Sequence, residues 1–450
     1  MRMLGKRGGC VKSRSVSEAR AREGHVSGAQ RTLRETPPRA VRYWLASLLL
    51  VVAGFGALRT FQGIMSSELP KDFVQYWAVG RLLLAGENPY DPALQLREER
   101  QVYPDRETAL MMWNPPPALP LYAPWGLLAP KPAALLWNGG QLLGILLASY
   151  LLVRIYAEGQ SWWLFLPMSL GFAGTVWLLF YGQNTGWILL GLAGFLWGQQ
   201  RNRPWLAGCF GALTVLKPHL LLGFGLVWLA DWCYCGRPRT ALLAGVITVL
   251  LATALAHIGD PWVVQHYLIA LREPSSFVIL PKDWVLPAAS YWLRLYMAPQ
   301  SMMVQFLPSI LASLAMLVWR VWCGKRWSWT QRLPVLIAVS FLTTGYGGWI
   351  FDLPVLLVPL IALAARMMRE KPILLVYLTL WQFLITWATL AFAAGLHAFW
   401  WVAPATLLPT LFLPFLRPAP ASSHAVQPLP SHFGDQSQFA PERDSSRCPW

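Results

Sequence analysis

Residues 240–257 read TALLAGVITVLLATALAH, eighteen consecutive positions without Asp, Glu, Lys or Arg. A helix needs about 20 mostly apolar residues to cross a bilayer core, so this stretch predicts a membrane-spanning helix. Similar runs recur between residues 43 and 416. The chain is 55% hydrophobic and 13% charged, about half the charge of a soluble domain. The runs are continuously apolar rather than alternating, so the sequence predicts an all-α polytopic membrane protein.

About twelve spanning segments are expected. The predicted spans are residues 43–63, 132–154, 162–180, 185–200, 204–216, 218–233, 240–257, 302–322, 334–346, 350–366, 372–392 and 396–415. They form one membrane domain, 43–416, with long external loops at 64–131 and 258–301. Segments 204–216 and 334–346 are short for a full crossing, and we expect them to be tilted or partial spans.

The distribution of basic residues supports this order of segments. Lys and Arg concentrate in the cytoplasmic loops of membrane proteins. Successive spans cross the membrane in alternating directions, which assigns each connecting loop to one side. Every short connection on the side of the N-terminal tail carries Lys or Arg. These basic residues are Arg154, Arg201, Arg203, Arg237, Arg239, Lys325, Arg326, Arg332, Arg366, Arg369 and Lys371. The two long loops fall on the opposite, extracytoplasmic side.

Two polar tails flank the membrane domain. Residues 1–42 are rich in Arg and Ser, which favours a disordered cytoplasmic tail near anionic lipid. An organellar transit peptide and a wrongly assigned start remain open alternatives. Residues 417–450 are rich in Pro and Ser and are predicted to be disordered. The net charge of +16 comes without a nucleic-acid-binding motif, so membrane lipids rather than nucleic acid are the expected partners.

The first external loop is expected to contain interfacial helices. Residues 73–85 place aromatic and aliphatic side chains on one helical face, which is typical of a helix along a membrane surface. Gly86 can end this helix. Residues 115–130 begin with three prolines and end at Pro130, which predicts a short interfacial or re-entrant helix.

Four polar positions fall on the same external face in this topology. Asp72 follows the first span, Gln183 lies between the third and fourth, Lys217 ends the fifth, and Asp352 begins the tenth. An acidic residue at the mouth of an apolar helix is costly and needs partners. Because scattered polar residues would fall on both faces, the common depth of these four predicts a site.

The two carboxylates also have a simpler explanation. Asp72 can cap the helix 73–85, with Gln75 as the partner of a capping-box-like pair. Asp352 can cap a helix that begins at Leu353. Capping does not exclude a functional role.

The other polar positions are equally open to a structural explanation. Lys217 can extend its charged end to the membrane surface, and Gln183 with Asn184 can form only a polar turn. Arg272 and Arg294, among aromatic residues of the second loop, can form a phosphate or sugar surface or simply a solvated loop. The histidines show no metal-ligand spacing, so no metal is predicted.

The ordered motifs around these residues resemble glycosyltransferase family 87, membrane enzymes of the C-type (GT-C) superfamily that use polyprenyl-phosphate sugars. The resemblance spans about residues 45–415 and rests on Asp72-Phe73 with Tyr76, Gly86-Glu87-Asn88-Pro89-Tyr90-Asp91-Pro92, Asn114-Pro115-Pro116-Pro117, Gly182-Gln183-Asn184, Leu216-Lys217-Pro218 and Phe351-Asp352-Leu353. Two positions depart from the family pattern. Phe351 stands where Tyr or His is frequent, which weakens a role for Asp352, and Asn114 stands where an aromatic is frequent.

The resemblance implies a GT-C-type fold in the cell (inner) membrane with an extracytoplasmic active site. It implies transfer of a hexose, with mannose favoured, from a polyprenyl-phosphate donor to a hydroxyl of a lipid or glycan acceptor, with inversion. Asp72 would be the general base. The expected substrate-binding residues are Lys217, Asp352, Gln183, Tyr76, Arg272 and Arg294. Phosphate is already a good leaving group, so neither a metal nor a cofactor is expected.

Two other classes of function remain. A transporter or flippase would show internal repeats and polar residues near the membrane midplane, and the sequence has no obvious repeat. A non-catalytic membrane scaffold would tolerate loss of Asp72.

Overall fold

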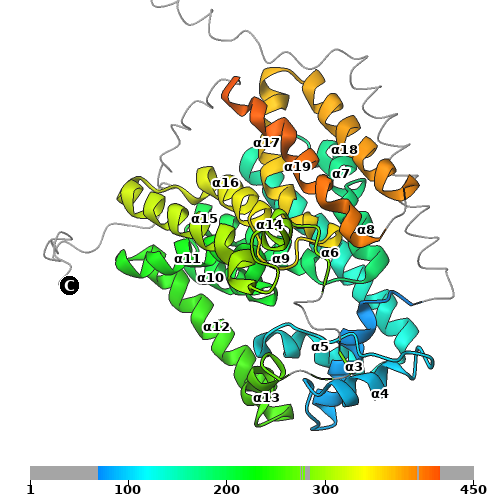
Figure 1. Cartoon of the computed structure of the whole chain (residues 1–450). Helices are drawn as coiled ribbons and strands as arrows, with labels where there is room; N and C mark the ends of the chain where they lie inside the picture. The colour runs from blue at the N-terminus through cyan, green and yellow to red at the C-terminus, as the bar shows by residue number, and fades with distance from the viewer. Residues whose placement is uncertain (1–68, 274, 276, 279–283, 393–394, 416–450) are drawn as a thin grey trace, which may run out of the picture. The chain divides into compact units, whose positions relative to one another are not determined.

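The computed structural model describes residues 69–273, 275, 277–278, 284–392 and 395–415. Within these residues the chain is helical and has no β-strand (Figure 1). The first predicted span, 43–63, and both predicted tails lie outside the described residues. The all-α prediction is confirmed for the part of the chain that the structure describes.

Helices α3 (Phe73–Leu84), α4 (Pro92–Glu99), α5 (Leu119–Gly126) and α13 (Val263–Ala270) of the predicted external loops gather beside one another in Figure 1. The 3₁₀ turn η1 (Pro116–Ala118) directly precedes α5, whereas α14 (Ala289–Met297) lies apart from this group and packs on the helix at Met302–Cys323. Helix α3 confirms the helix expected at 73–85. It packs on α4 and α5 and is buried on nearly all sides, so it is more enclosed than an amphipathic helix on a membrane surface.

The remaining helices follow the predicted apolar segments. They are α6 (Pro130–Tyr156), η2 (Trp162–Phe165), α7 (Leu166–Leu170), α8 (Ala173–Tyr181), α9 (Thr185–Gln200), α10 (Pro204–Ala212), η3 (Leu213–Leu216), η4 (Pro218–Leu221), α11 (Leu222–Leu229), η5 (Ala230–Cys233), α12 (Arg237–Gly259), α15 (Met302–Cys323), η7 (Gly324–Arg326), α16 (Trp329–Leu342), η8 (Ile350–Leu356), α17 (Leu357–Glu370), α18 (Ile373–Ala391), η9 (Leu396–Trp401), α19 (Val402–Leu407) and η10 (Leu408–Phe415).

The described residues contain five helices long and apolar enough to cross a membrane, or up to seven if each of two bent pairs is one span. The protein is therefore a multi-pass membrane protein, while the total of twelve spans stays a prediction. One bent pair joins residues 162–170 to 173–181 at 58°, and the other joins 204–216 to 218–233 at 119°. The second bend occurs at Lys217, where a following proline cannot continue the helical hydrogen bonds. The short segment 204–216 thus belongs to a sharply bent pair.

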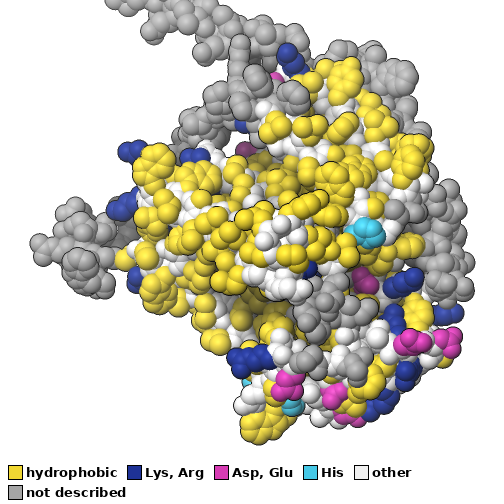
Figure 2. Space-filling view, viewed as in Figure 1, with side chains coloured by type: hydrophobic (Ala, Val, Ile, Leu, Met, Phe, Trp, Pro, Cys, Tyr) yellow, Lys and Arg dark blue, Asp and Glu magenta, His cyan; other side chains and the backbone are white. Residues whose placement is uncertain are grey.

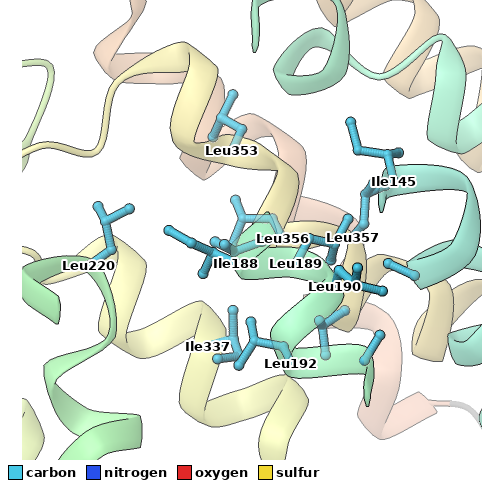
Figure 3. Close-up of a cluster of buried hydrophobic side chains, with 14 of the residues drawn as sticks. Ile145, Ile188, Leu189, Leu190, Leu192, Leu220, Ile337, Leu353, Leu356 and Leu357 are labelled. Carbon is cyan, nitrogen blue, oxygen red and sulfur yellow. The ribbon is translucent and has the colours of Figure 1, made fainter. Parts of the chain in front are cut away.

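Helix α9 lies at the centre of the hydrophobic core. Its side chains Ile188, Leu189 and Leu192 are fully buried and face residues of α6, α16 and η8 in Figure 3. Packing on several sides holds α9 in place, although its 16 residues give a helix of only about 24 Å. The first residues of α9 therefore have a defined position next to η8.

The outer surface separates apolar from charged side chains. Figure 2 shows hydrophobic side chains over the middle of the molecule, in the area of α14, α15 and α16, and charged side chains near α3 and α4. Large exposed apolar residues are frequent along α12 and α15, for example Leu250, Leu251 and Val318. Such continuous apolar surface is expected where helices contact lipid rather than water.

Candidate functional site

A cavity of about 670 Å³ lies among the external helices, the bend at Lys217 and the start of η8. The predicted residues Asp72, Tyr76, Gln183, Lys217 and Asp352 all line it. They come from four separate segments of the chain. The tertiary structure therefore brings together the positions that the topology predicted at one depth.

Asp72 precedes α3 but does not cap it. Its side chain makes no cap hydrogen bond, and its carboxylate oxygen Oδ2 accepts a hydrogen bond from Gln183 Nε2 at 2.7 Å. The Asp72 backbone N–H donates to the carbonyl of Tyr181 at 3.0 Å. The capping explanation from the sequence is thus replaced by a contact with a residue over one hundred positions away.

The turn that carries Gln183 needs the glycine before it. Gly182 has φ of +71°, a left-handed conformation that side-chain-bearing residues rarely adopt. A Cβ atom at Gly182 would also lie 2.7 Å from the Cβ of Phe73. The polar turn expected at Gln183 and Asn184 therefore exists, and its close approach to the start of α3 brings Gln183 to Asp72.

Gln183 connects the two halves of the site. Its Oε1 accepts hydrogen bonds from Tyr76 Oη at 2.8 Å and from Lys217 Nζ at 2.8 Å. Its Nε2 is thereby directed to Asp72. Because both donors bind the amide oxygen, the orientation of the amide is determined by its partners.

Lys217 does not extend to the membrane surface. Its Nζ forms an ion pair with Asp352 Oδ1 at 2.6 Å, and the two side chains are 9% and 1% exposed. Burial of both charges favours the pair only when the remaining bonding capacity is satisfied. Asp352 Oδ1 also accepts from Thr185 Oγ1 at 3.1 Å, and Oδ2 accepts from the Trp349 backbone N–H at 3.1 Å. Asp352 therefore holds the first turn of η8 and pairs with Lys217 at once.

Burial raises the pKa of the Asp72 carboxyl to about 6. The hydrogen bond from Gln183 and the positive charges of Lys217 and Arg106 oppose this rise. Arg106 pairs with the buried Glu99 at 2.9 Å. A carboxyl with a pKa in this range can accept a proton near neutral pH, as a general base must.

Aromatic side chains support the wall behind Asp72. The rings of Tyr76 and Tyr122 stack at 4.6 Å, and Tyr122 Oη accepts a hydrogen bond from Asn184 Nδ2 at 2.7 Å. Burial raises the pKa of both tyrosines, so both hydroxyls remain protonated. Tyr76 therefore stays a donor to Gln183.

The two arginines predicted from the second external loop do not line the cavity. Arg272 is exposed. Arg294 is buried, and its Nη1 lies 2.9 Å from the Sδ of Met302, which lines the cavity. Their role in substrate binding stays a prediction without support from this geometry.

The structure also adds residues that the sequence did not single out. His219 and His397 line the cavity, together with the aromatic side chains of Trp113, Trp284 and Tyr346. In the sequence, the one indication that His219 lies near the site was its position two residues after Lys217. No comparable signal existed for Trp284 or His397, because their segments meet only in the tertiary structure.

Asn114 has a positional role at the bend. Its Nδ2 donates to the carbonyl of Leu216, and its own carbonyl accepts from Tyr90 Oη at 2.8 Å. The bend leaves the Leu216 carbonyl without a helical partner. Asn114 satisfies that carbonyl directly before Lys217.

Among the described residues, no group of three or more His, Cys, Asp or Glu side chains is arranged to hold a metal ion. The cavity instead combines one ion pair, one further carboxylate and neutral hydrogen-bonding groups. Such a set can accept a proton, orient hydroxyl groups and stabilise a developing negative charge.

A sequence model of glycosyltransferase family 87 matches residues 113–371. This range is more than half of the chain, and it includes Gln183, Lys217 and Asp352. Asp72 and Tyr76 precede it. No curated protein and no solved structure matches the chain.

Proposed function

The chain belongs to glycosyltransferase family 87 and is a membrane glycosyltransferase, and we propose that it transfers a hexose from a polyprenyl-phosphate donor to an acceptor hydroxyl at the cavity around Asp72. The observation that carries this proposal is the set of contacts from Asp72 through Gln183 to the Lys217–Asp352 pair. This set provides a base and a cation in one cavity.

Asp72 acts as the general base in this proposal. Gln183 occupies Oδ2 of the carboxylate, which leaves Oδ1 for the proton of the acceptor hydroxyl. As that proton moves to Asp72, the acceptor oxygen attacks the anomeric carbon. The bond from that carbon to the phosphate oxygen breaks, and both electrons stay with the phosphate. Attack opposite the leaving group inverts the configuration.

Lys217 stabilises the leaving phosphate. A lysine ammonium has three N–H donors, and Asp352 and Gln183 occupy two of them. The third can bind a phosphate oxygen without breaking either contact. Asp352, Gln183 and Tyr76 then set the position of the cation and the base.

The lipid character of the donor fits the position of the cavity. Apolar residues line part of the wall, among them Leu271, Met302, Phe306 and Leu396, and the neighbouring helix α15 has a large apolar surface. Within this proposal mannose is the favoured hexose, a lipid or glycan supplies the hydroxyl, and the cavity faces the extracytoplasmic side of the cell membrane.

Membranes that contain the full chain provide the test. A radiolabelled polyprenyl-phosphate mannose is supplied, and transfer is compared between the wild type, Asp72→Asn and Asp105→Asn. Asp105 is exposed in the same loop and does not line the cavity. We expect Asp72→Asn to reduce transfer by about 10²–10⁴-fold, the usual worth of general-base catalysis, and Asp105→Asn to retain it. Undiminished transfer by Asp72→Asn would remove Asp72 as the base.

A further inference from the structure

His219 stands on the cavity wall beside the cation of the site. It follows Lys217 by two residues, at the beginning of η4, and both residues line the cavity. No hydrogen bond from its ring to another described residue is present, whereas its backbone carbonyl accepts from Thr344 Oγ1 at 3.2 Å. Its backbone is therefore held while its ring nitrogens stay available.

The loop opposite His219 gives the ring a defined place. The ring packs edge-on against Tyr346, with centroids 5.0 Å apart. Gly347 comes next with φ of +73°, and a Cβ atom there would lie only 2.9 Å from His219 Nε2. A side chain at Gly347 would thus be strained and would crowd the imidazole. The same loop ends at Trp349, whose N–H binds Asp352.

The charges around Lys217 indicate that the leaving phosphate needs a second hydrogen-bond donor. Asp352 lies 2.6 Å from the ammonium and compensates its charge. Within the described part of the chain, Lys217 is the only Lys or Arg that lines the cavity. The phosphate of the donor carries a negative charge and gains a second one as the bond to the sugar breaks, since the second pKa of a phosphate monoester is about 6.

We propose that His219 is a further catalytic residue, which donates a hydrogen bond from a ring N–H to the leaving phosphate beside Lys217. This inference rests on the proposed function. A neutral imidazole keeps one N–H donor, so no proton has to be transferred. The bond changes remain those of the glycosyl transfer: the acceptor proton goes to Asp72, and the electron pair of the broken bond stays on the phosphate.

The contact between His219 and the phosphate can be tested without the chemical step, by measuring binding of the lipid phosphate that the reaction releases. Undecaprenyl phosphate is the probe, and the neutral alcohol undecaprenol, which lacks the phosphate, is the control. The purified full chain is compared with His219→Phe, which keeps an aromatic ring against Tyr346 but has no N–H donor, and with His219→Gln, which keeps a donor. His257→Phe is the control because His257 is half-buried and does not line the cavity.

We expect His219→Phe to weaken binding of undecaprenyl phosphate by roughly 10- to 100-fold, the worth of a hydrogen bond to a charged group. Binding of undecaprenol should not change. His219→Gln should recover most of the affinity, and His257→Phe should match the wild type. If His219→Phe does not fold, His219→Leu takes its place in the same comparison.

Two results would overturn the inference: unchanged phosphate binding by His219→Phe, or an equal loss for phosphate and alcohol. The second would show a structural role only. Asp72→Asn separates the inference from the proposed function, since it should lose transfer and still bind undecaprenyl phosphate. If Asp72→Asn retains transfer, Asp72 is not the base, and if the wild type transfers no sugar from the polyprenyl-phosphate donor, the proposed function fails, whatever His219 does.

Discussion

Among the described residues, two buried ion pairs that join distant segments of the chain differ in what else touches them. Lys217 and Asp352 lie on a cavity wall and share Gln183 and Thr185 as partners. Arg320 of α15 and Asp231 of η5 pair at 2.7 Å, and their side chains are 3% and 0% exposed. Neither Arg320 nor Asp231 lines the cavity. We refer to the two as the cavity pair and the closed pair.

The closed pair is surrounded by protein. Asp231 Oδ1 accepts two hydrogen bonds from Arg320, and Oδ2 accepts one from Trp329 Nε1 at 3.2 Å. The guanidinium stacks over Tyr234 at 3.9 Å. The Lys217 ammonium of the cavity pair lies 5.3 Å from the centre of the Phe351 ring and donates to Asp352 and Gln183, and its third N–H has no hydrogen-bond acceptor among the described residues. The two ion pairs thus have similar burial and similar N–O distances but different roles. The difference lies in whether the cation has an N–H left to bind a ligand and whether it lines a cavity.

The largest expected effect concerns the closed pair and stability. Arg320→Met leaves Asp231 buried without its cation, a change that typically costs about 3–5 kcal/mol. We expect a marked fall of the unfolding temperature in detergent. The double variant Arg320→Met with Asp231→Asn should recover much of the stability and, once folded, transfer sugar normally. Loss of transfer by a stable double variant would contradict the assignment of a structural role.

The next effect concerns the cavity pair and activity. Lys217→Met removes the proposed phosphate ligand, and we expect kcat to fall by about 10²–10³-fold, as for other donors to a developing charge. Lys217→Met also leaves Asp352 buried without its cation, and adding Asp352→Asn should restore the lost stability. Transfer should stay low in this double variant, whereas the double variant of the closed pair should transfer sugar normally. The comparison breaks down if this double variant regains activity.

A smaller effect than these losses is expected for the way kcat/KM depends on pH. Asp72 must be ionised to accept a proton, so kcat/KM should rise with pH through about 6 and then level off. The hydrogen bond from Gln183 stabilises the ionised form and lowers the Asp72 pKa. Gln183→Leu should therefore move the rise to higher pH. A rise that stays in place would show that Gln183 does not act on the Asp72 carboxylate.

The smallest effect is expected for Tyr76. Tyr76→Phe removes one of two donors to Gln183 Oε1 while Lys217 remains. The net worth of such a bond is about 0.5–1.5 kcal/mol, so kcat/KM should fall roughly 2- to 13-fold without a change of fold. A loss as large as that of Asp72→Asn would assign Tyr76 a direct contact with substrate.

Continuous apolar runs were sufficient to predict most of the long helices. The runs at 240–257, 302–322 and 372–392 correspond to α12, α15 and α18 within a few residues, because a continuous apolar stretch of this length has few alternatives to a helix in lipid. The bend of 119° at Lys217 was visible only as two short segments. Its angle depends on the packing of both arms, which no local pattern encodes.

The sequence by itself determined that this is a helical membrane protein and predicted Asp72, Gln183, Lys217 and Asp352 at a common depth, because hydrophobic length and the placement of basic loops act segment by segment. Only the tertiary structure decided that Asp72 binds Gln183 instead of capping α3, that Lys217 pairs with Asp352, and that His219 joins them on one wall. The contacts Asp72–Gln183 and Lys217–Asp352 join residues more than one hundred positions apart, so they depend on how the helices pack.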